Sequence, residues 1–176
     1  MIELESTRLH IRELTAEDLP NVLPVYTSNP DVVQRMEGSE GVVGQYDLER
    51  WQRDWHIAQL MPGRYTLGCY LKDHGEAVGY VDYLQENEED GKPWLGQLMI
   101  HKDYQRQGLG SEVFHCLIEH FRKDYTWSLL RTGVLETNGP GLAFVQNVGF
   151  QPIKKVSQRL AEGVQQFIIF ERSLSE

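Results

Sequence analysis

Hydrophobic and polar positions recur along the chain with two periods, one typical of strands and the other of helices. The stretch Trp94–His101 is short, apolar and bounded by turn residues, which predicts a buried strand. From Ser111 onward, apolar residues recur every three or four positions, which predicts an amphipathic helix. The apolar positions of this helix are Val113, Phe114, Leu117, Ile118 and Phe121. Lys102–Gly110 lies between them and contains two glycines, so the predicted unit is strand, glycine loop and helix.

The N-terminal part alternates between structured and patternless stretches. Arg8–Leu14 alternates apolar and polar residues as an edge strand would, and Thr15–Asp18 resembles a capping box at the start of a helix. Asn29–Tyr46 contains three glycines and no periodicity, so we expect a surface loop or a segment that shapes an acceptor site. Asp47 is expected to cap a helix that ends before Pro62, with its tryptophans in the core.

Short apolar runs in most of the remaining chain predict strands. Turn residues separate the apolar runs, and one further helix is expected after the turn Thr137–Pro140. The predicted strands are Tyr65–Leu71, Ala77–Leu84, Leu129–Leu135, Pro152–Leu160 and Val164–Phe170. The acidic run Glu86–Asp90 is either a rim that attracts amines or a solvated loop.

Length and composition fit one globular domain over residues 1–176. The chain is 40% hydrophobic and 24% charged, and no repeat, linker or apolar run of about 18 residues interrupts it. The N-terminus lacks the pattern of a signal peptide, and Cys69 and Cys116 belong to no Cys-x-x-Cys pair. We therefore expect buried thiols, a reducing cytoplasm and no membrane association.

The net charge of −9 disfavours nucleic-acid binding, because that affinity depends on neutralising phosphates. An acidic surface could attract a cationic amine, or it could serve solubility alone. His115 and His120 are five positions apart and therefore off the spacing that aligns two metal ligands on a helix, so no metal site is expected.

The glycine loop has two interpretations from spacing alone. A helix N-terminus that follows glycines can bind an anion such as phosphate, or the glycines can serve only a tight turn. Two known phosphate motifs are excluded. Gly110 is followed by Ser111 rather than the Lys of a P-loop, and position 113 is Val113 rather than the third glycine of a dinucleotide fingerprint.

The run Gln105-Arg106-Gln107-Gly108-Leu109-Gly110, which follows Leu98-Met99-Ile100, resembles the acyl-CoA pyrophosphate loop of the GNAT superfamily of N-acetyltransferases. Asn138 and the helix that ends in Gly149-Phe150 extend the resemblance over roughly Lys92–Phe150. It implies an α/β (α+β) fold with a mixed, mostly antiparallel twisted sheet flanked by helices. It also implies acetyl transfer from acetyl-CoA to a primary amine on a small molecule or a protein N-terminus. The opening Thr7–Arg12 resembles the branch that acetylates ribosomal proteins.

The resemblance assigns roles to residues along this unit. N–H groups across Arg106–Ser111 would hold the pyrophosphate, while a bulged strand would present its backbone to the pantetheine arm. An N–H of Leu98 or Met99 would stabilise the oxyanion. The expected cofactor-binding residues are Leu98, Met99, Ile100, Gln105, Arg106, Gln107, Gly108, Leu109, Gly110, Ser111, Asn138 and Phe144.

The acid and base of the family are missing here. Family members often carry a Glu where this chain has Trp94, and a Tyr where it has Val145. An aliphatic amine has a pKa of about 10.4, so a base is useful. Asp82 is the first substitute and Glu136 the second, although Asp82 could also be a plain solvent-facing strand residue.

Two other functions stay open. The missing acid and base would suit a silent acyl-CoA sensor or protein-interaction module, and a helix-loop nucleotide binder would prefer ATP to CoA. The sequence names neither the amine nor the oligomeric state, and a homodimer is compatible with the resemblance.

Overall fold

The computed structural model describes residues 1–37, 46–160 and 162–175. The strands are β1 (Glu3–Glu5), β2 (Leu9–Glu13), β3 (Arg64–Leu71), β4 (Ala77–Leu84), β5 (Trp94–Ile100), β6 (Leu129–Leu135), β7 (Gln151–Leu160) and β8 (Gly163–Ser173). The helices are α1 (Leu19–Thr27), α2 (Pro30–Glu37), α3 (Leu48–Gln59), α4 (Leu109–Asp124) and α5 (Gly139–Asn147). Short 3₁₀ turns precede α1 and α4, at Ala16–Asp18 and Lys102–Tyr104.

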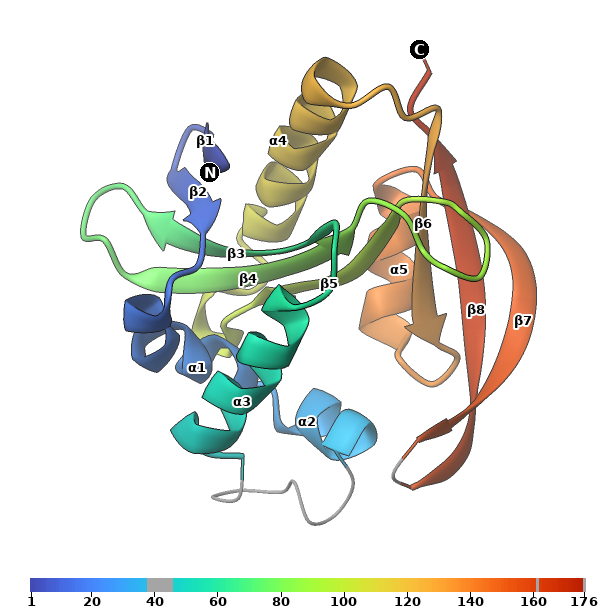
Figure 1. The fold of residues 1–176 in the computed structure, drawn as a ribbon, viewed down its shortest axis with the longest axis horizontal. Coiled ribbons are helices and arrows are strands. Elements are labelled where there is room, and N and C mark those ends of the chain that lie inside the picture. The colour runs from blue at the N-terminus through green and yellow to red at the C-terminus, as the bar shows by residue number, and fades with distance from the viewer. Residues whose placement is uncertain (38–45, 161, 176) are drawn as a thin grey trace.

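The strands form one sheet in the order β1-β2-β3-β4-β5-β6-β8-β7 (Figure 1). Neighbouring strands are antiparallel except β5 and β6, which are parallel. The connection between these two strands is α4, as a parallel pair requires a crossover. The predicted fold class, a mixed and mostly antiparallel sheet flanked by helices, is confirmed.

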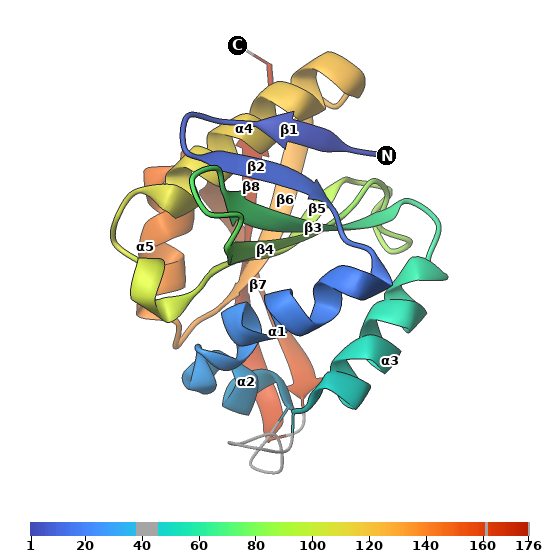
Figure 2. The ribbon, with the colours of Figure 1, turned by 90° about the vertical axis from the view of Figure 1, so that its left-hand side faces the viewer.

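Helices cover the two faces of the sheet separately. Figure 2 shows α4 on one side of β3 and β4, with α1 and α3 on the other. Successive side chains of a strand point to opposite faces of the sheet and therefore enter two separate hydrophobic cores. Val81 packs in the core on the α4 side, and Tyr80 packs in the core on the side of α1 and α3. The predicted apolar face of α4 is fully in the core, and Phe121 is 0% exposed.

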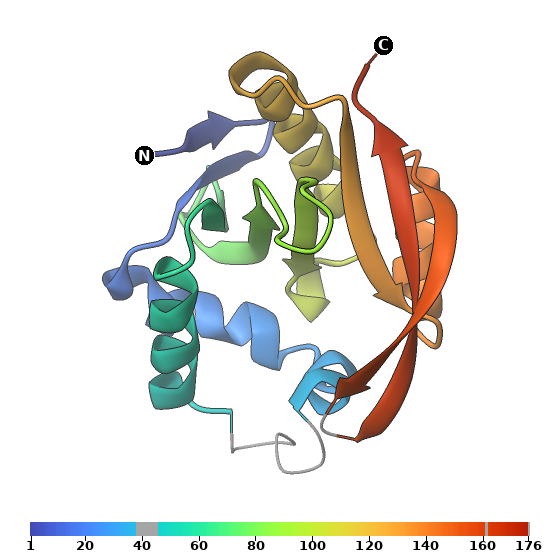
Figure 3. The same cartoon turned by 45° about the vertical axis from the view of Figure 1, so that its right-hand side comes forward.

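The parallel strands β5 and β6 pair at one end and then diverge (Figure 3). Their described ladder contains the pair Trp94 and Arg131. The β4–β5 register shifts between Asp82 and Tyr83, because Gly96 is an extra residue on β5. The bulge implied by the resemblance is therefore present, and it lies where the two strands begin to separate.

Two expectations for the N-terminal part need correction. The predicted edge strand β2 lies between β1 and β3, because residues 3–5 pair outside it, and Leu9 is 0% exposed. The expected loop Asn29–Tyr46 begins with helix α2, whose first residue is proline, a favoured first residue of helices, and whose Val33 is buried. Residues 38–45, with their three glycines, lie outside the described residues.

Other local predictions are confirmed. The Asp47 side chain accepts a hydrogen bond from the Arg50 N–H at 3.0 Å and caps α3. The Asp18 carboxylate accepts from the Thr15 N–H at 2.8 Å, which completes the expected capping turn. Trp51 lies in the core at 5% exposure.

Candidate functional site

The loop before α4 presents free backbone N–H groups. Gly108 is the N-cap of α4 with φ of 79°, and Arg106 also has a positive φ of 59°. The first helical bond runs from Glu112 N–H to Gly108 carbonyl at 3.0 Å. The N–H groups of residues 109–111 therefore have no acceptor within the helix, which makes this end of α4 suited to bind an anion.

The loop, β5 and α5 meet around Gly110. A Cβ at this position would lie 3.3 Å from Phe144, 3.7 Å from Ile100 and 3.8 Å from Leu98. Three separately predicted contact residues thus gather on one side of the helix N-terminus. Leu109 is 3% exposed and packs into the core, so only its backbone is available to a ligand.

The backbone N–H groups of the neighbouring residues Leu98 and Met99 on β5 point in opposite directions. The His101 N–H donates to the Val78 carbonyl of the β4 side at 2.9 Å. Because N–H groups of an antiparallel strand alternate in direction, that of Met99 points toward β4, while those of Leu98 and Ile100 point toward the diverging β6. The geometry therefore favours Leu98 over Met99 for any role toward a ligand between these strands.

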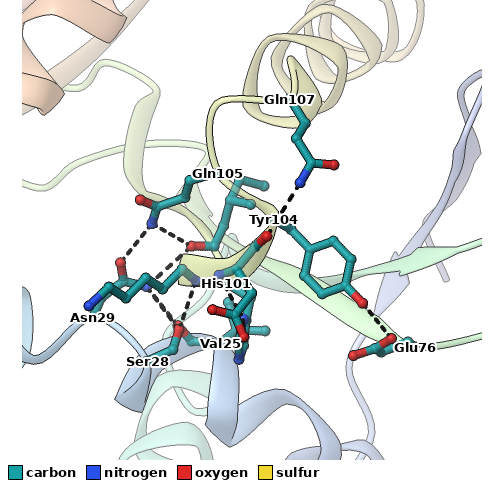
Figure 4. Close-up of polar contacts among 11 residues, drawn as sticks. Val25, Ser28, Asn29, Glu76, His101, Tyr104, Gln105 and Gln107 are labelled. Carbon is teal, nitrogen blue, oxygen red and sulfur yellow. Dashed lines mark hydrogen bonds and ion pairs between the residues drawn. The ribbon is translucent and has the colours of Figure 1, made fainter.

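The carbonyl of Ile100 already has two partners. Gln105 Nε2 donates to it at 2.9 Å, and Asn29 Nδ2 donates at 3.2 Å. Gln105 Nε2 also donates to Asn29 Oδ1 at 2.7 Å, and Figure 4 shows these two side chains facing each other. The Gln105 side chain thus ties the loop to the end of β5 and to the segment between α1 and α2.

Asn138 lies at the N-terminus of α5. Its Oδ1 accepts from the Gly141 N–H at 3.1 Å and caps the helix, which directs the side-chain amide back over the turn. This oxygen is therefore engaged, and the amide nitrogen is the group left for the predicted contact with a cofactor arm.

The Asp82 carboxylate is buried at 6% exposure, so it is not the solvent-facing residue of the alternative interpretation. Arg64 Nε donates to its Oδ2 at 2.9 Å, and Tyr80 Oη donates to the same oxygen at 3.4 Å. No described residue donates a hydrogen bond to its Oδ1, and a Cβ at residue 96 would lie 2.8 Å from this atom. One oxygen is held, and the other lies over the exposed Gly96 at the bulge.

Two opposing effects act on the Asp82 pKa. Burial raises the pKa of this carboxyl above its ordinary value, and the Arg64 guanidinium opposes the rise through its charge and its hydrogen bond. Tyr80 beside it has a pKa well above its ordinary value, because the phenol is buried next to the carboxylate. Asp82 is thus a more basic carboxylate than an exposed one, and Tyr80 is a weaker acid than an exposed phenol.

The other residues considered as acid or base have different partners. Glu136 is exposed and forms an ion pair with Lys155. Tyr83 Oη bonds to Tyr125 Oη at 3.2 Å in the core, and Tyr104 Oη donates to Glu76 at 2.6 Å. Val145 is 6% exposed and packs in the α4-side core.

Trp94, at the position where the resemblance implies Glu, has a structural partner. Its Nε1 donates to Asp90 Oδ2 at 3.0 Å, and Arg131 Nη1 donates to the same oxygen at 2.8 Å. Arg131 also bonds Glu171 at 3.0 Å. This cluster joins β5 to β6 at their paired end, so Asp90 is a structural residue of the acidic run.

Sequence reasoning missed Arg64 and Gly96. A glycine inside a strand is a known signal of a bulge, so Gly96 was within reach of the sequence. Arg64 was not, because its contact with Asp82 depends on the register of β3 against β4, where Arg64 pairs with Leu84.

Two absences hold for the described part of the chain. Residues 1–37, 46–160 and 162–175 contain no group of three His, Cys, Asp or Glu side chains placed to hold a metal ion. None of the helices described in these ranges is long and apolar enough to cross a membrane.

The sequence and the structure were compared with those of known proteins. Residues 8–151 match the family model of the acetyltransferase (GNAT) domain. The chain belongs to this family, as the resemblance of the glycine loop indicates.

Two kinds of relatives are similar to the chain. A probable spermine N(1)-acetyltransferase of Bacillus subtilis subsp. natto is 30% identical over 90 residues, which cover 48% of this chain. The chain spans 58% of the length of that curated relative. An acetyltransferase of Thermus thermophilus has a TM-score of 0.75 at 22% identity, over 98% of this chain and 99% of the other. A ribosomal L7/L12 alpha-N-protein acetyltransferase, solved in complex with coenzyme A, has a TM-score of 0.80 at 13% identity, over 98% of both chains.

Proposed function

We propose that the protein is an N-acetyltransferase that moves an acetyl group from acetyl-CoA to a primary amine. The observation that carries this proposal is the Asp82 carboxylate, whose Oδ1 lies over the Gly96 bulge where β5 and β6 begin to diverge. Asp82 pairs with Gln97, the residue before Leu98 on β5, so its carboxylate would serve as the base close to the strand that binds the thioester. The family model supports the donor, since acetyl-CoA is the substrate of GNAT acetyltransferases.

The residues present fit the donor. Free N–H groups of Leu109, Gly110 and Ser111 would hold the pyrophosphate, and glycine at position 110 leaves space that a side chain would fill. The outward N–H groups of Leu98 and Ile100 would pair with the pantetheine arm as a sheet edge pairs with an added strand. Phe144 would supply an apolar wall.

The chemistry needs a deprotonated amine and a stabilised oxyanion. Asp82 Oδ1 would accept the proton of the amine, directly or through water, and this could raise the rate by about 10²–10⁴-fold. The Leu98 N–H would donate to the carbonyl oxygen as that oxygen gains negative charge. The C–N bond forms as the C–S bond breaks, and the thiolate resembles a Cys thiolate with a pKa of about 8.5, so it can leave without a side-chain acid at position 145.

We infer that a linear polyamine is the first acceptor to test. Its support is the similarity to spermine acetyltransferases and the net charge of −9, which would favour a polycation. A peptide that begins with Ser or Ala is the second, because one structural neighbour modifies the N-terminal serine of ribosomal protein L7/L12 and another is a ribosomal-protein-S5-alanine acetyltransferase.

The test is a turnover assay with acetyl-CoA against spermine, spermidine, N-terminal peptides and small primary amines. We expect acetylation of at least one amine and a loss of about 10²-fold or more in Asp82→Asn. Coenzyme A binding without turnover of any amine would instead support the silent acyl-CoA module.

A further inference from the structure

The Thr7–Arg12 segment, which the sequence set apart, reaches the glycine loop through Arg8. Arg8 precedes β2, and its side chain spans to the N-terminus of α4. Its backbone N–H and its Nε donate to the two oxygens of Glu112, each at 2.7 Å. Its Nη1 donates to the carbonyl of Gln107 at 2.9 Å. One arginine thus joins a distant strand, the first turn of α4 and the loop.

The bond to Gln107 fixes the direction of a loop amide. The peptide unit between residues 107 and 108 is planar and trans, so its carbonyl and its N–H point in opposite directions. Because the carbonyl of Gln107 points to Arg8, the Gly108 N–H points away from Arg8. The guanidinium also packs against Gly108, since a Cβ there would lie 3.5 Å from Arg8 Nη2. Arg8 therefore holds this peptide in one of its two orientations.

Arg8 also offsets a charge that would oppose an anion. Glu112 lies in the first turn of α4 with its side chain 16% exposed. Burial acts to raise its pKa, but hydrogen bonds from the Arg8 N–H, the Ser6 hydroxyl and the guanidinium outweigh burial and hold the pKa below its usual value. The carboxylate is thus ionised near the phosphate end of the loop, where it would repel a pyrophosphate. The paired guanidinium carries the opposite charge and opposes that repulsion.

We propose that Arg8 is a positioning residue for the phosphate-binding loop, which orients the Gly108 N–H and neutralises Glu112 for donors that carry a pyrophosphate. This inference rests on the proposed function, because it assumes that acetyl-CoA binds at this loop. It assigns no contact between Arg8 and the reacting atoms. Removal of the Arg8 side chain should therefore weaken binding of the donor and leave the rate of the chemical step unchanged.

The experiment compares two donors in Arg8→Ala. Acetyl-CoA carries the pyrophosphate, whereas S-acetylpantetheine carries the same thioester and arm without it. We expect Arg8→Ala to lower kcat/KM for acetyl-CoA by about 10- to 100-fold through KM. With S-acetylpantetheine the change is expected to stay within about twofold, because no phosphate is present. Arg8→Lys, which keeps the charge and one donor, is expected to recover part of the loss.

The matched control is Arg53→Ala. Arg53 is an exposed arginine with a 3.9 Å contact to Asp54, on the helix α3. It should change neither donor's kinetics. Equal losses with both donors would show that Arg8 only supports the fold, and no loss with acetyl-CoA would show that the loop does not need it. Either result overturns the inference.

Calorimetry separates this inference from the proposed activity. If the wild-type protein binds CoA but acetylates no amine, the proposed activity is refuted. The CoA affinity of Arg8→Ala, compared with that of the wild type, then still tests the role of Arg8 in the loop. If the wild-type protein binds no CoA, both are overturned.

Discussion

Asp82 and Gly96 lie across β4 and β5 from each other, so close that a Cβ on residue 96 would lie 2.8 Å from Asp82 Oδ1. The glycine therefore makes room for this carboxylate oxygen. Arg64 holds the other oxygen at 2.9 Å, so the carboxylate cannot move away without breaking the ion pair. Bulge, glycine and carboxylate form one unit.

Gly96→Ala tests this unit. We expect kcat to fall by about tenfold or more, because the added methyl group displaces Asp82 Oδ1. Steady-state kinetics with saturating acetyl-CoA measure the effect. The control is the same substitution in an Asp82→Asn background, where it should cost little further activity. A loss of equal size in both backgrounds would mean that Gly96 acts independently of Asp82.

Arg64 should set the contribution of Asp82 to the pH dependence of activity, in addition to the rise that deprotonation of the amine causes. Burial raises the Asp82 pKa and Arg64 lowers it, so Arg64→Gln should raise this pKa further. A base with a higher pKa is protonated up to a higher pH, so the acid limb of kcat/KM against pH should move upward. Arg64→Lys keeps a cation and should shift the limb less. A limb that stays in place in Arg64→Gln would argue against Asp82 as the base.

No tyrosine should be essential as an acid. Of the three candidates, Tyr83 and Tyr104 form hydrogen bonds with Tyr125 and Glu76, respectively, whereas Tyr80 donates to Asp82. We expect each Tyr→Phe change to retain turnover, with less than about tenfold loss in Tyr80→Phe. The wild-type kcat/KM should rise through neutral pH and then flatten, as the amine loses its proton. A falling alkaline limb that disappears in Tyr80→Phe, with a loss of about 100-fold in kcat, would establish Tyr80 as the acid.

Gly110→Asp should weaken acetyl-CoA binding sharply. The new side chain would lie toward Phe144, Ile100 and Leu98 and would bring a negative charge to the helix N-terminus. Calorimetry with CoA measures the affinity, and thermal unfolding checks the fold. Ser157→Asp adds the same charge on the exposed strand β7 and should leave affinity unchanged. Unaltered affinity in Gly110→Asp would remove the loop from the binding site.

The Arg12–Asp18 pair should make stability depend on pH. The hydrogen bond from Arg12 Nη2 to Asp18 at 2.6 Å is the main reason that the Asp18 pKa lies well below its usual value. A depressed pKa contributes stability above the unfolded value of about 3.9, and this contribution is lost as pH falls through the folded value. Asp18→Asn should therefore lower the free energy of unfolding by about 2 kcal/mol at pH 7, and by less at pH 3.

Urea unfolding at pH 7, 5 and 3 tests this expectation. Asp73→Asn, in an exposed turn, serves as the control and should have no effect at any of these pH values. A deficit in Asp18→Asn that stays constant from pH 7 to pH 3 would contradict the assignment.

The sequence correctly predicted the features that depend on neighbouring residues alone. The caps at Asp47 and Thr15–Asp18, the hairpins and the helix α4 follow from residue type and period, and the structure has them. The order of the strands, the place of β2 inside the sheet and the Arg64–Asp82 pair depend on contacts between distant segments. Periodicity holds no information about such contacts, so the burial of Asp82 required the structure.

The side chains that donate to the Ile100 carbonyl limit the length of the free backbone edge of β5. Its exposed backbone edge ends at one side where Thr132 Oγ1 takes the Leu95 carbonyl at 2.8 Å, and at the other where Asn29 and Gln105 take that of Ile100. Beyond the bulge at Gly96, the stretch left between these two carbonyls is about three residues, or roughly 10 Å. The arm of acetyl-CoA, if it pairs with β5 as proposed, would meet this short stretch of free edge, and its thioester would then lie at a set distance from the N-terminus of α4, where the pyrophosphate would bind.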